Sequence, residues 1–277
     1  MVIDMIDPVK IAPDAEFSVS DKISIGAYTR IGKGFKVKCR SLHIGRHCWI
    51  GEGVEIKYGS AMNPWADVTI GDFTGLMDRV LINASRPVAI GKECGLGVET
   101  QIWTHSQWLP IMQGFPMQKE EPVTIGDRVW LPSRCQVLPG VTIGSNVVVG
   151  IGSVVNRSLP SGCFAAGHPA KIIREQCYPY EPSLNELHAE IMRIITNYRV
   201  IAADKGFDPL LYHEYGIEET IIFSFDGERV VFNLDTMEYS PLRISVYAED
   251  FRDHLRRNGL KFYGGGFFES LTPTRFK

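Results

Sequence analysis

An aliphatic residue recurs at every sixth position through much of the first 155 residues, and this period constrains the fold more than any other feature. Eighteen register positions are all Ile, Leu or Val, and the register never slips within a set of three. They are Ile25, Ile31, Val37, Ile44, Ile50, Ile56, Ile70, Leu76, Ile82, Ile90, Leu96, Ile102, Ile125, Leu131, Val137, Ile143, Val149 and Val155. A sustained internal period indicates a repeat architecture rather than an ordinary β-sandwich.

Two further columns accompany the aliphatic one. Gly follows the aliphatic residue at ten of the eighteen positions. The residue four places after the aliphatic one is mostly small, with Phe35 as the bulky exception. We expect the glycine to support a turn that a Cβ atom would strain, and the small residue to fill the remaining interior. The glycines are Gly26, Gly32, Gly45, Gly51, Gly71, Gly91, Gly97, Gly126, Gly144 and Gly150.

The repeat predicts a three-sided solenoid. Each hexapeptide would form a short strand and a corner, and three flat faces would make one coil of eighteen residues. Coils would stack at the spacing of hydrogen-bonded strands, so about six of them would span on the order of 29 Å. Each coil would cover the strand edges of the coil before it.

Insertions into the register all fall between sets of three, which places them at one corner of the solenoid. The longest inserts seventeen residues between Ile102 and Ile125, and His105 follows Ile102 by three residues. Loops gathered on one edge of a rigid repeat are a frequent place for a binding site. His105 is therefore the leading candidate for a functional side chain, against the alternative of a loop histidine with no role.

The chain resembles the hexapeptide-repeat acyltransferases, most specifically through "THS" at 104–106 and "EPVTIGDRVW…AAGHPAKIIRE" at 121–175. These segments look like the C-terminal signature of the maltose, galactoside and xenobiotic acetyltransferases. The clear resemblance covers 68–175 and a looser one covers 11–67. It implies an all-β left-handed parallel β-helix at 11–175 with an external loop at 106–122. It also implies a homotrimer with active sites between subunits.

The resemblance also implies roles for individual residues. His105 falls on the catalytic histidine, and Trp130 falls on a tryptophan that lines the cleft. Positions that approach the pantetheine arm of acetyl-CoA correspond to Ser133, Gly150, Ile151 and Gly152. Positions that hold the nucleotide end of the same cofactor correspond to Asn156, Arg157, Lys171 and Arg174.

Two departures from the family pattern concern the turn beside Trp130 and the acceptor. Pro132 replaces a usual glycine, and the asparagine that contacts the acceptor in galactoside-type enzymes falls in register on Met77. The remaining candidates for acceptor binding are Asp78, Asn83 and the two tryptophans that flank His105, Trp103 and Trp108.

An unperturbed histidine titrates near pH 6.5, which suits proton removal from an attacking hydroxyl at neutral pH. A positioned general base contributes about 10²–10⁴ in rate. Backbone N–H groups are the expected donors to the oxyanion, and CoA would leave as its thiolate without a covalent enzyme intermediate. Cys94 and Cys135 stand in the small-residue column, so we expect them in the core rather than as nucleophiles.

Composition narrows the class further. A net charge of −3 gives no reason to expect nucleic acid, and six cysteines without a C-x-x-C pair indicate neither a disulfide framework nor a zinc cluster. The N-terminus has acids at positions 4 and 7, which does not suit a signal peptide, and no apolar run is long enough for a membrane span. We expect a soluble, cytoplasmic protein.

Residues 176–277 match no family pattern. "CYPYEPS" is a linker, and Ser183 to Glu186 form an S-x-x-E capping box before a helical pattern that runs to Tyr198. "TIIFSF" and "RVVFNL" flank Asp226-Gly227, which predicts a hairpin, and a second helix is expected at 248–258. This region is expected to be a small α+β domain of unassigned role.

The resulting hypothesis is an acetyl-CoA-dependent O-acetyltransferase that acts on a sugar of a surface polysaccharide such as O-antigen or capsule, or on its precursor. N-acetylation of a nucleotide-linked amino sugar and succinyl-CoA as the donor stay open. An alternative of another class is a β-helical zinc lyase resembling carbonic anhydrase, for which His43 and His47 would be the only early histidine pair. A non-catalytic scaffold is the third class.

Overall fold

The computed structural model describes residues 3–5, 8–57, 63–106, 109–115, 119–214, 218–264 and 266–273. The chain divides into two compact units, Met1–Tyr180 and Glu181–Lys277. Among the described residues, no helix is both long enough and apolar enough to cross a bilayer.

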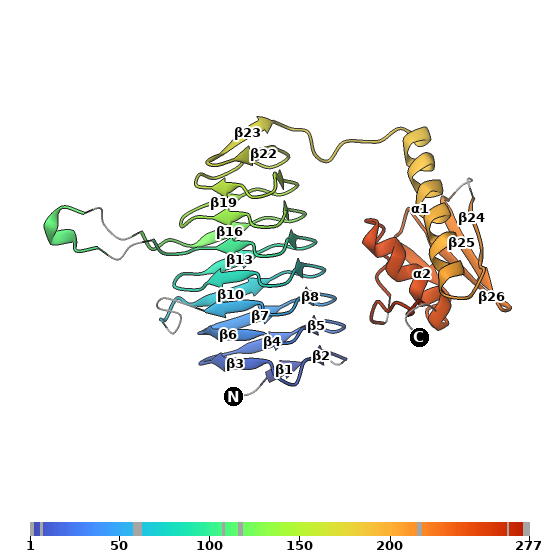
Figure 1. Cartoon of the computed structure of the whole chain (residues 1–277), viewed down its shortest axis with the longest axis horizontal. Coiled ribbons are helices and arrows are strands. Elements are labelled where there is room, and N and C mark those ends of the chain that lie inside the picture. Colours follow the sequence, from blue (N-terminus) through green and yellow to red (C-terminus); the bar gives the residue numbers. More distant parts are fainter. Residues whose placement is uncertain are drawn as a thin grey trace. The chain divides into compact units, whose positions relative to one another are not determined.

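Three sheets, parallel except for the last strand of sheet B, form the N-terminal unit, and each coil visits them in the order A, B, C (Figure 1). Sheet A consists of β1 (Ile3–Met5), β4 (Ile23–Ile25), β7 (Ser41–Ile44), β10 (Asp67–Ile70), β13 (Val88–Ile90), β16 (Val123–Ile125) and β19 (Thr142–Ile143). Sheet B consists of β2 (Lys10–Ile11), β5 (Arg30–Ile31), β8 (Trp49–Ile50), β11 (Gly75–Leu76), β14 (Gly95–Leu96), β17 (Trp130–Leu131), β20 (Val148–Val149), β22 (Phe164–Gly167) and β23 (Ala170–Arg174). Sheet C consists of β3 (Glu16–Val19), β6 (Lys36–Cys39), β9 (Glu55–Lys57), β12 (Leu81–Asn83), β15 (Gln101–Ile102), β18 (Gln136–Val137) and β21 (Val154–Val155).

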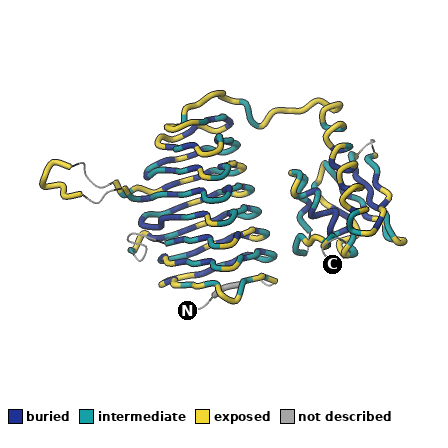
Figure 2. Tube along the Cα trace, viewed as in Figure 1, coloured by how far each residue is buried: buried dark blue, intermediate teal, exposed yellow. Residues whose placement is uncertain are grey.

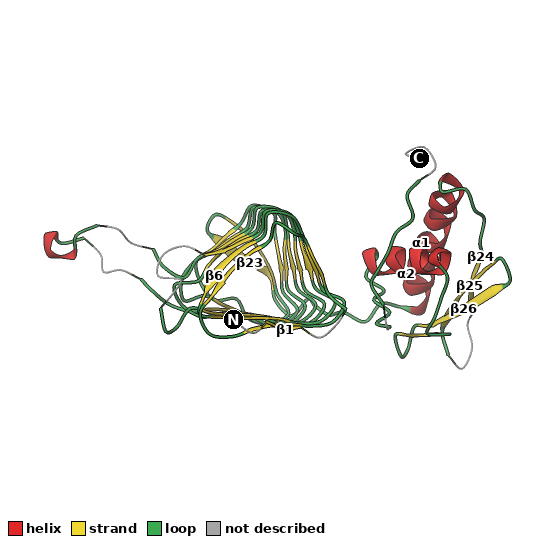
Figure 3. Ribbon diagram, turned by 90° about the horizontal axis from the view of Figure 1, so that it is seen from below, coloured by secondary structure: helices red, strands yellow, loops and turns green. Residues whose placement is uncertain are grey.

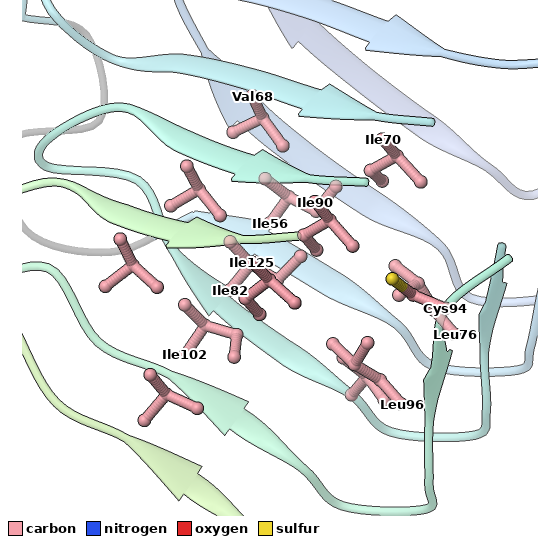
Figure 4. Packing of buried hydrophobic residues seen from close by; sticks show 14 of the residues in the cluster. Ile56, Val68, Ile70, Leu76, Ile82, Ile90, Cys94, Leu96, Ile102 and Ile125 are labelled. Atoms are coloured by element: carbon pink, nitrogen blue, oxygen red, sulfur yellow. The ribbon is translucent and has the colours of Figure 1, made fainter. Parts of the chain in front are cut away.

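The unit is a left-handed parallel β-helix of triangular cross-section, as the repeat and the resemblance predicted (Figure 3). Identical register positions pair across coils, as Ile70 does with Ile44 and Ile90. All eighteen aliphatic positions are buried, and so is the small-residue column with Phe35 (Figures 2 and 4). Seven full coils are present in the described residues, one more than expected, because β1–β3 form a further coil in which Met5, Ile11 and Phe17 stand at the register positions.

The prediction for the repeat glycines was wrong in its physical reason. None of the ten has a positive φ; instead, a Cβ atom at Gly26 would lie 2.4 Å from the backbone nitrogen of Arg46 in the next coil. The glycines are required because stacked coils approach too closely for a side chain. The left-handed turn position is the third residue after the aliphatic one; thirteen of these residues have a positive φ, and nine of the thirteen are not glycine, among them His47 and Arg134.

Corners are named here by the sheets they join. Corner CA, between sheets C and A, carries the insertions; corner BC, between sheets B and C, is a tight four-residue turn in every coil. The longest insertion leaves corner CA after β15, as predicted, and projects from the β-helix (Figure 3). Its base is a short ribbon in which Ser106 N–H donates to the Lys119 carbonyl at 3.1 Å. Beyond the base, a 3₁₀ turn at Ile111–Gln113 lies within an exposed segment at 109–115.

The C-terminal unit is a small α+β domain. An antiparallel sheet in the order β24 (Leu210–Glu214), β25 (Thr220–Phe225), β26 (Glu228–Asn233), β27 (Glu238–Ser240) packs with α1 (Leu184–Asp204) and α2 (Val246–Arg257). The predicted capping box is present, because Ser183 Oγ accepts from Glu186 N–H and the Glu186 carboxylate accepts from Ser183 N–H. The hairpin at Asp226-Gly227 is also confirmed.

Candidate active site

His105 lies at corner CA of the fifth coil, just after β15, and is half-buried. It forms an isolated antiparallel bridge with Glu120, which fixes its backbone at the base of the external loop. Its Nδ1 atom is buried and has no hydrogen-bond partner among the described residues. Nδ1 is therefore the nitrogen that needs an orienting acceptor, and Nε2 is the candidate nitrogen for contact with a substrate.

A buried polar group lies beside His105 in the same corner. The Thr104 hydroxyl donates to Asn83 Oδ1 at 2.7 Å, and Ser85 N–H donates to the same oxygen at 3.3 Å. Asn83 is fully buried, yet its Nδ2 atom has no partner among the described residues. The carboxamide is thus fixed by its oxygen while its donor side is unused, which leaves two N–H groups available one coil from His105.

Arg86 connects this corner to the external loop. Its guanidinium pairs with Glu120 at 3.0 Å and lies 4.4 Å from the ring centroid of Trp65. Both partners of the ion pair are mostly buried, with side-chain exposures of 26% and 20%. The contact holds the loop strand that bridges to His105. Sequence reasoning missed Arg86 and Glu120, although both stand in corner CA insertions and carry opposite charges.

The predicted pantetheine-binding residues lie on a different corner. Ser133 is in the corner BC turn of the sixth coil, and Gly150, Ile151 and Gly152 form that turn in the seventh. Ile151 is 75% exposed, and nothing lies within 4 Å of where a Cβ atom of Gly152 would stand. Sheet C separates this corner from corner CA, so one chain does not bring these residues to His105.

Trp130 lies on the outer face of sheet B, where its ring rests on Gly95. A Cβ atom at Gly95 would meet the Trp130 ring at 2.5 Å, so the glycine creates the space that the ring occupies. Trp130 is still 42% exposed. Pro132 has no N–H, so it cannot make the inter-coil bond that Gly97 N–H makes to Leu131 and Gly150 N–H makes to Ala165.

The predicted nucleotide-binding residues gather at the C-terminal end of the β-helix. Lys171 and Arg174 are exposed on β23, which pairs antiparallel with β22, and the Arg174 guanidinium lies 5.6 Å from the Phe164 ring centroid. Asn156 and Arg157 are exposed just after β21. Lys171 and Arg174 thus lie on one strand of sheet B, whereas Arg157 lies at corner CA of the last coil.

The acceptor candidates divide between the two corners. Trp103 lies at corner CA, and its indole N–H donates to Gln101 Oε1 at 3.1 Å, so it leans toward sheet C. Asp78 lies at corner BC, where its Oδ1 accepts from Glu52 N–H at 2.9 Å. Trp108 lies outside the described residues.

A charged ladder, also missed by sequence reasoning, runs along corner BC. Glu99 pairs with Arg79 at 3.1 Å and with Arg134 at 2.8 Å, from three successive coils. The hydrogen bond from Arg134 is the main reason that the pKa of Glu99 is lowered. The ladder lies between Asp78 and Ser133 on the same corner.

The cysteines of the small-residue column are core residues, as expected. Cys94 and Cys135 are buried, and burial raises the pKa of the Cys135 thiol. His43 lies exposed on sheet A, and the His47 ring stacks between Tyr28 and Phe73 at the opposite corner from the insertions. Among the described residues, no group of three or more His, Cys, Asp or Glu side chains could hold a metal ion.

A three-sided parallel β-helix with loops at one corner is the architecture expected of a hexapeptide-repeat transferase. The family model described as "Bacterial transferase hexapeptide (six repeats)" matches residues 122–157. The putative colanic acid biosynthesis acetyltransferase WcaF of Escherichia coli K12 is 32% identical over 144 residues, which cover 52% of this chain and 75% of the relative.

Two further proteins are similar to this chain. The galactoside O-acetyltransferase of Escherichia coli K12 is 30% identical over 132 residues, covering 48% of this chain and 63% of that one. The hexapeptide-repeat acetyltransferase VCA0836 of Vibrio cholerae, solved with acetyl coenzyme A, has a TM-score of 0.42 and 28% identity, covering 48% of this chain and 70% of that one. The chain belongs to the hexapeptide-repeat acetyltransferases and is an acyltransferase.

Proposed function

We propose that this enzyme transfers an acetyl group from acetyl-CoA to a hydroxyl of a sugar in a surface polysaccharide or its precursor, with His105 as the general base. The observation that carries the proposal is a half-buried histidine at the loop-bearing corner whose buried Nδ1 has no partner among the described residues. The names of the relatives, a colanic acid biosynthesis acetyltransferase and a galactoside O-acetyltransferase, support the sugar hydroxyl as the acceptor.

The residues of corner BC fit a long ligand that bears phosphates. Gly152 and Ser133 present backbone at this corner, Lys171 and Arg174 supply positive charge on β23 of the adjoining sheet B, and Arg157 adds positive charge from corner CA of the last coil. Acetyl-CoA supplies the thioester. His105 Nε2 removes the proton of the acceptor hydroxyl as its oxygen bonds to the thioester carbonyl carbon, the C–S bond breaks, and the thiolate of CoA receives a proton.

We propose that the active site forms between subunits of a homotrimer. His105 at corner CA and Ser133 at corner BC are separated by sheet C within one chain, so a complete site requires corner CA of one subunit to face corner BC of another. The orienting acceptor for His105 Nδ1 would come from the same interface.

A thiol-release assay with acetyl-CoA tests the base. Across sugar and amino-sugar acceptors, His105→Ala should lower kcat by about 10² or more and leave cofactor binding intact. The matched control is His43→Ala, an exposed histidine on sheet A, which should retain the rate. Equal rates for His105→Ala and the wild type would remove His105 from the mechanism, and a panel with succinyl-CoA identifies the donor.

Hybrid trimers test the shared site. Co-refolded His105→Ala and Ile151→Asp chains, each inactive alone, should recover about a quarter of the wild-type activity at equal mixing, because some interfaces then pair two intact halves. Ile151 is suited to this test because it is exposed and can be changed without disturbing the core. No recovery would place the whole site within one chain.

A further inference from the structure

A groove of about 360 Å³ lies along sheet B and corner BC in the first four coils. The side chains that matter here are those of Lys10, Arg30, Lys33, Trp49, Glu52 and Asp78. All of these residues are described, and the groove is separate from the corner that carries His105. Apart from Asp78, none of its residues has a role in the proposed reaction.

The strand register places two cations and a tryptophan in one row across this groove. Lys10 pairs with Arg30, and Arg30 pairs with Trp49, on adjacent parallel strands. Each is followed by a register-column isoleucine that points into or packs against the core, so by strand alternation the three side chains point outward. Successive strands are about 4.8 Å apart, so the ammonium of Lys10, the guanidinium of Arg30 and the indole of Trp49 follow one another at regular intervals.

The same row contains a second tryptophan with a different environment. Beyond Trp49 the row continues through Gly75 and Gly95 to Trp130. The Trp130 ring covers Gly95, but no atom of Trp49 lies within 4 Å of a Cβ position at Gly75, which only the Met77 methyl approaches. Trp49 therefore does not rest on that glycine, and at 46% exposure its ring borders the groove.

The chemistry of the groove fits an acidic sugar chain. An exposed indole on a rigid strand offers a flat apolar face to the C–H face of a pyranose ring. Three cations and two carboxylates line the groove, and the Asp78 carboxylate is engaged by Glu52 N–H at 2.9 Å. By formal charge the lining carries three positive and two negative side chains, and this excess favours carboxylates on the ligand.

The position of the groove relates it to the reaction. The groove ends at Asp78 on corner BC of the fourth coil, and the residues proposed for acetyl-CoA occupy the same corner in the sixth and seventh coils. We infer that the groove binds the non-reacting sugar residues of an anionic oligosaccharide acceptor. A hydroxyl of the reacting sugar then lies at the height of the fifth coil, which carries His105 and lies between the groove and the acetyl-CoA residues. Its role as an acceptor site rests on the proposed function.

Direct binding tests the groove without any catalysis. Calorimetry on the full chain, with no acetyl-CoA, compares a hexamer of galacturonic acid with maltohexaose, a neutral chain of equal length. The acidic hexamer should bind more tightly, and its affinity should fall with added salt. Trp49→Ala and Arg30→Gln should each raise its Kd by about tenfold, whereas Trp49→Phe should retain most of the affinity.

Arg46→Gln is the matched control, because Arg46 is an exposed arginine at the corner between sheets A and B and should not change the Kd. In the thiol-release assay, Trp49→Ala should raise the ratio of KM for the hexamer to KM for a monosaccharide by about tenfold. Equal binding of both hexamers to wild type and Trp49→Ala would overturn the inference. So would a change of oligomeric mass in Trp49→Ala, which would assign Trp49 to a subunit interface.

The binding and activity readouts separate the two proposals. If no acceptor releases thiol but the acidic hexamer binds and Trp49→Ala weakens it, the proposed function fails and the glycan site stands. If His105→Ala abolishes transfer and the hexamer does not bind, the function stands and the groove fails.

Discussion

The two units of the chain bury polar groups in opposite ways. Among the described residues of the β-helix, the buried polar side chains are uncharged, such as Thr29, Thr74 and Thr100. In the C-terminal unit three charged side chains, Asp250, Arg252 and Asp253, are buried on a single helix, α2. In a repeat, a buried threonine hydroxyl finds backbone partners at the same place in the next coil. In a small irregular domain, each buried polar side chain needs its own set of partners.

The hydrogen bonds show how this difference arises. In the β-helix, Thr74 Oγ1 donates to the Gly91 carbonyl of the next coil at 2.8 Å and accepts from Cys94 N–H at 3.1 Å. Thr29 does the same with Gly45 and Cys48. In the C-terminal unit, Arg252 instead donates to three carbonyls of the C-terminal segment, those of Phe262, Gly266 and Phe267, and pairs with Glu249.

The chain carries separate spectroscopic probes for its two units. All five tryptophans lie within the first 130 residues, so indole fluorescence reports on the β-helix. Both α-helices among the described residues lie in the C-terminal unit, so the helical circular dichroism reports on that unit. Unfolding of the full chain can therefore be followed unit by unit.

The largest expected effect on stability is at Arg252. Arg252→Ala should destabilise the C-terminal unit by about 3–5 kcal/mol, because it leaves the mostly buried Glu249 carboxylate and three carbonyls without their donor. The helical signal should be lost at lower denaturant concentration, while the indole transition stays at its wild-type midpoint. The double variant Glu249→Gln/Arg252→Met should lose less than the single one. A shift of both transitions together would show that the two units unfold as one.

Glycine substitutions in the two units should have effects of intermediate size on stability, and they compare close backbone approach with backbone conformation. Gly97→Ala should cost about 1–3 kcal/mol, because its Cβ atom would lie 2.3 Å from Ser133 N in the next coil. Gly227→Ala in the C-terminal hairpin should cost about 1 kcal/mol, because φ is +78° and nothing lies within 4 Å. The indole transition should report the first and the helical transition the second. A larger loss at Gly227 than at Gly97 would contradict the close-approach explanation.

Gly97→Ala also has a functional consequence under the proposed mechanism. The displaced backbone belongs to Ser133, so the KM for acetyl-CoA should rise more than kcat falls. Gly126→Ala is a control with a similar clash against Ser145 at the corner between sheets A and B, away from Ser133. An equal change of KM in both variants would make the effect a general loss of stability.

The smallest expected effect is the response to acid. Burial lowers the pKa of His254 and His213 in the C-terminal unit below the ordinary value of about 6.5. Stability from these groups is fully present above that value and is lost as the pH falls from there toward their folded pKa, because the unfolded chain then binds more protons.

The groups that face the two histidines make this loss testable. The Ile194 carbonyl, Asp250, Lys205 and Arg257 act on His254, and Glu219 and His188 act on His213. Mild acidification should therefore shift the helical transition before the indole transition, and His254→Gln should reduce the shift. If the indole transition moved first, the loss of stability in acid could not be assigned to His254 and His213.

Much of the β-helix could be read from the sequence because its period is local. The aliphatic column, the corner that carries the insertions and the position of His105 beside the longest one follow from spacing alone. The first coil, β1–β3, was missed because Met5, Ile11 and Phe17 keep the six-residue spacing but place Met and Phe where the later coils have only Ile, Leu or Val. In the C-terminal unit the capping box and the Asp226-Gly227 turn were equally local signals.

By itself the sequence determined which side chains point inward, since a six-residue period alternates them along each face. Only the tertiary structure decided why the repeat glycines are needed, because that reason is the distance to a neighbouring coil rather than the conformation of their own turn. It alone also decided that His105 and Ser133 stand on different corners, and that Arg86 meets Glu120 across an insertion. These relations depend on how coils stack, and no spacing along one chain encodes them.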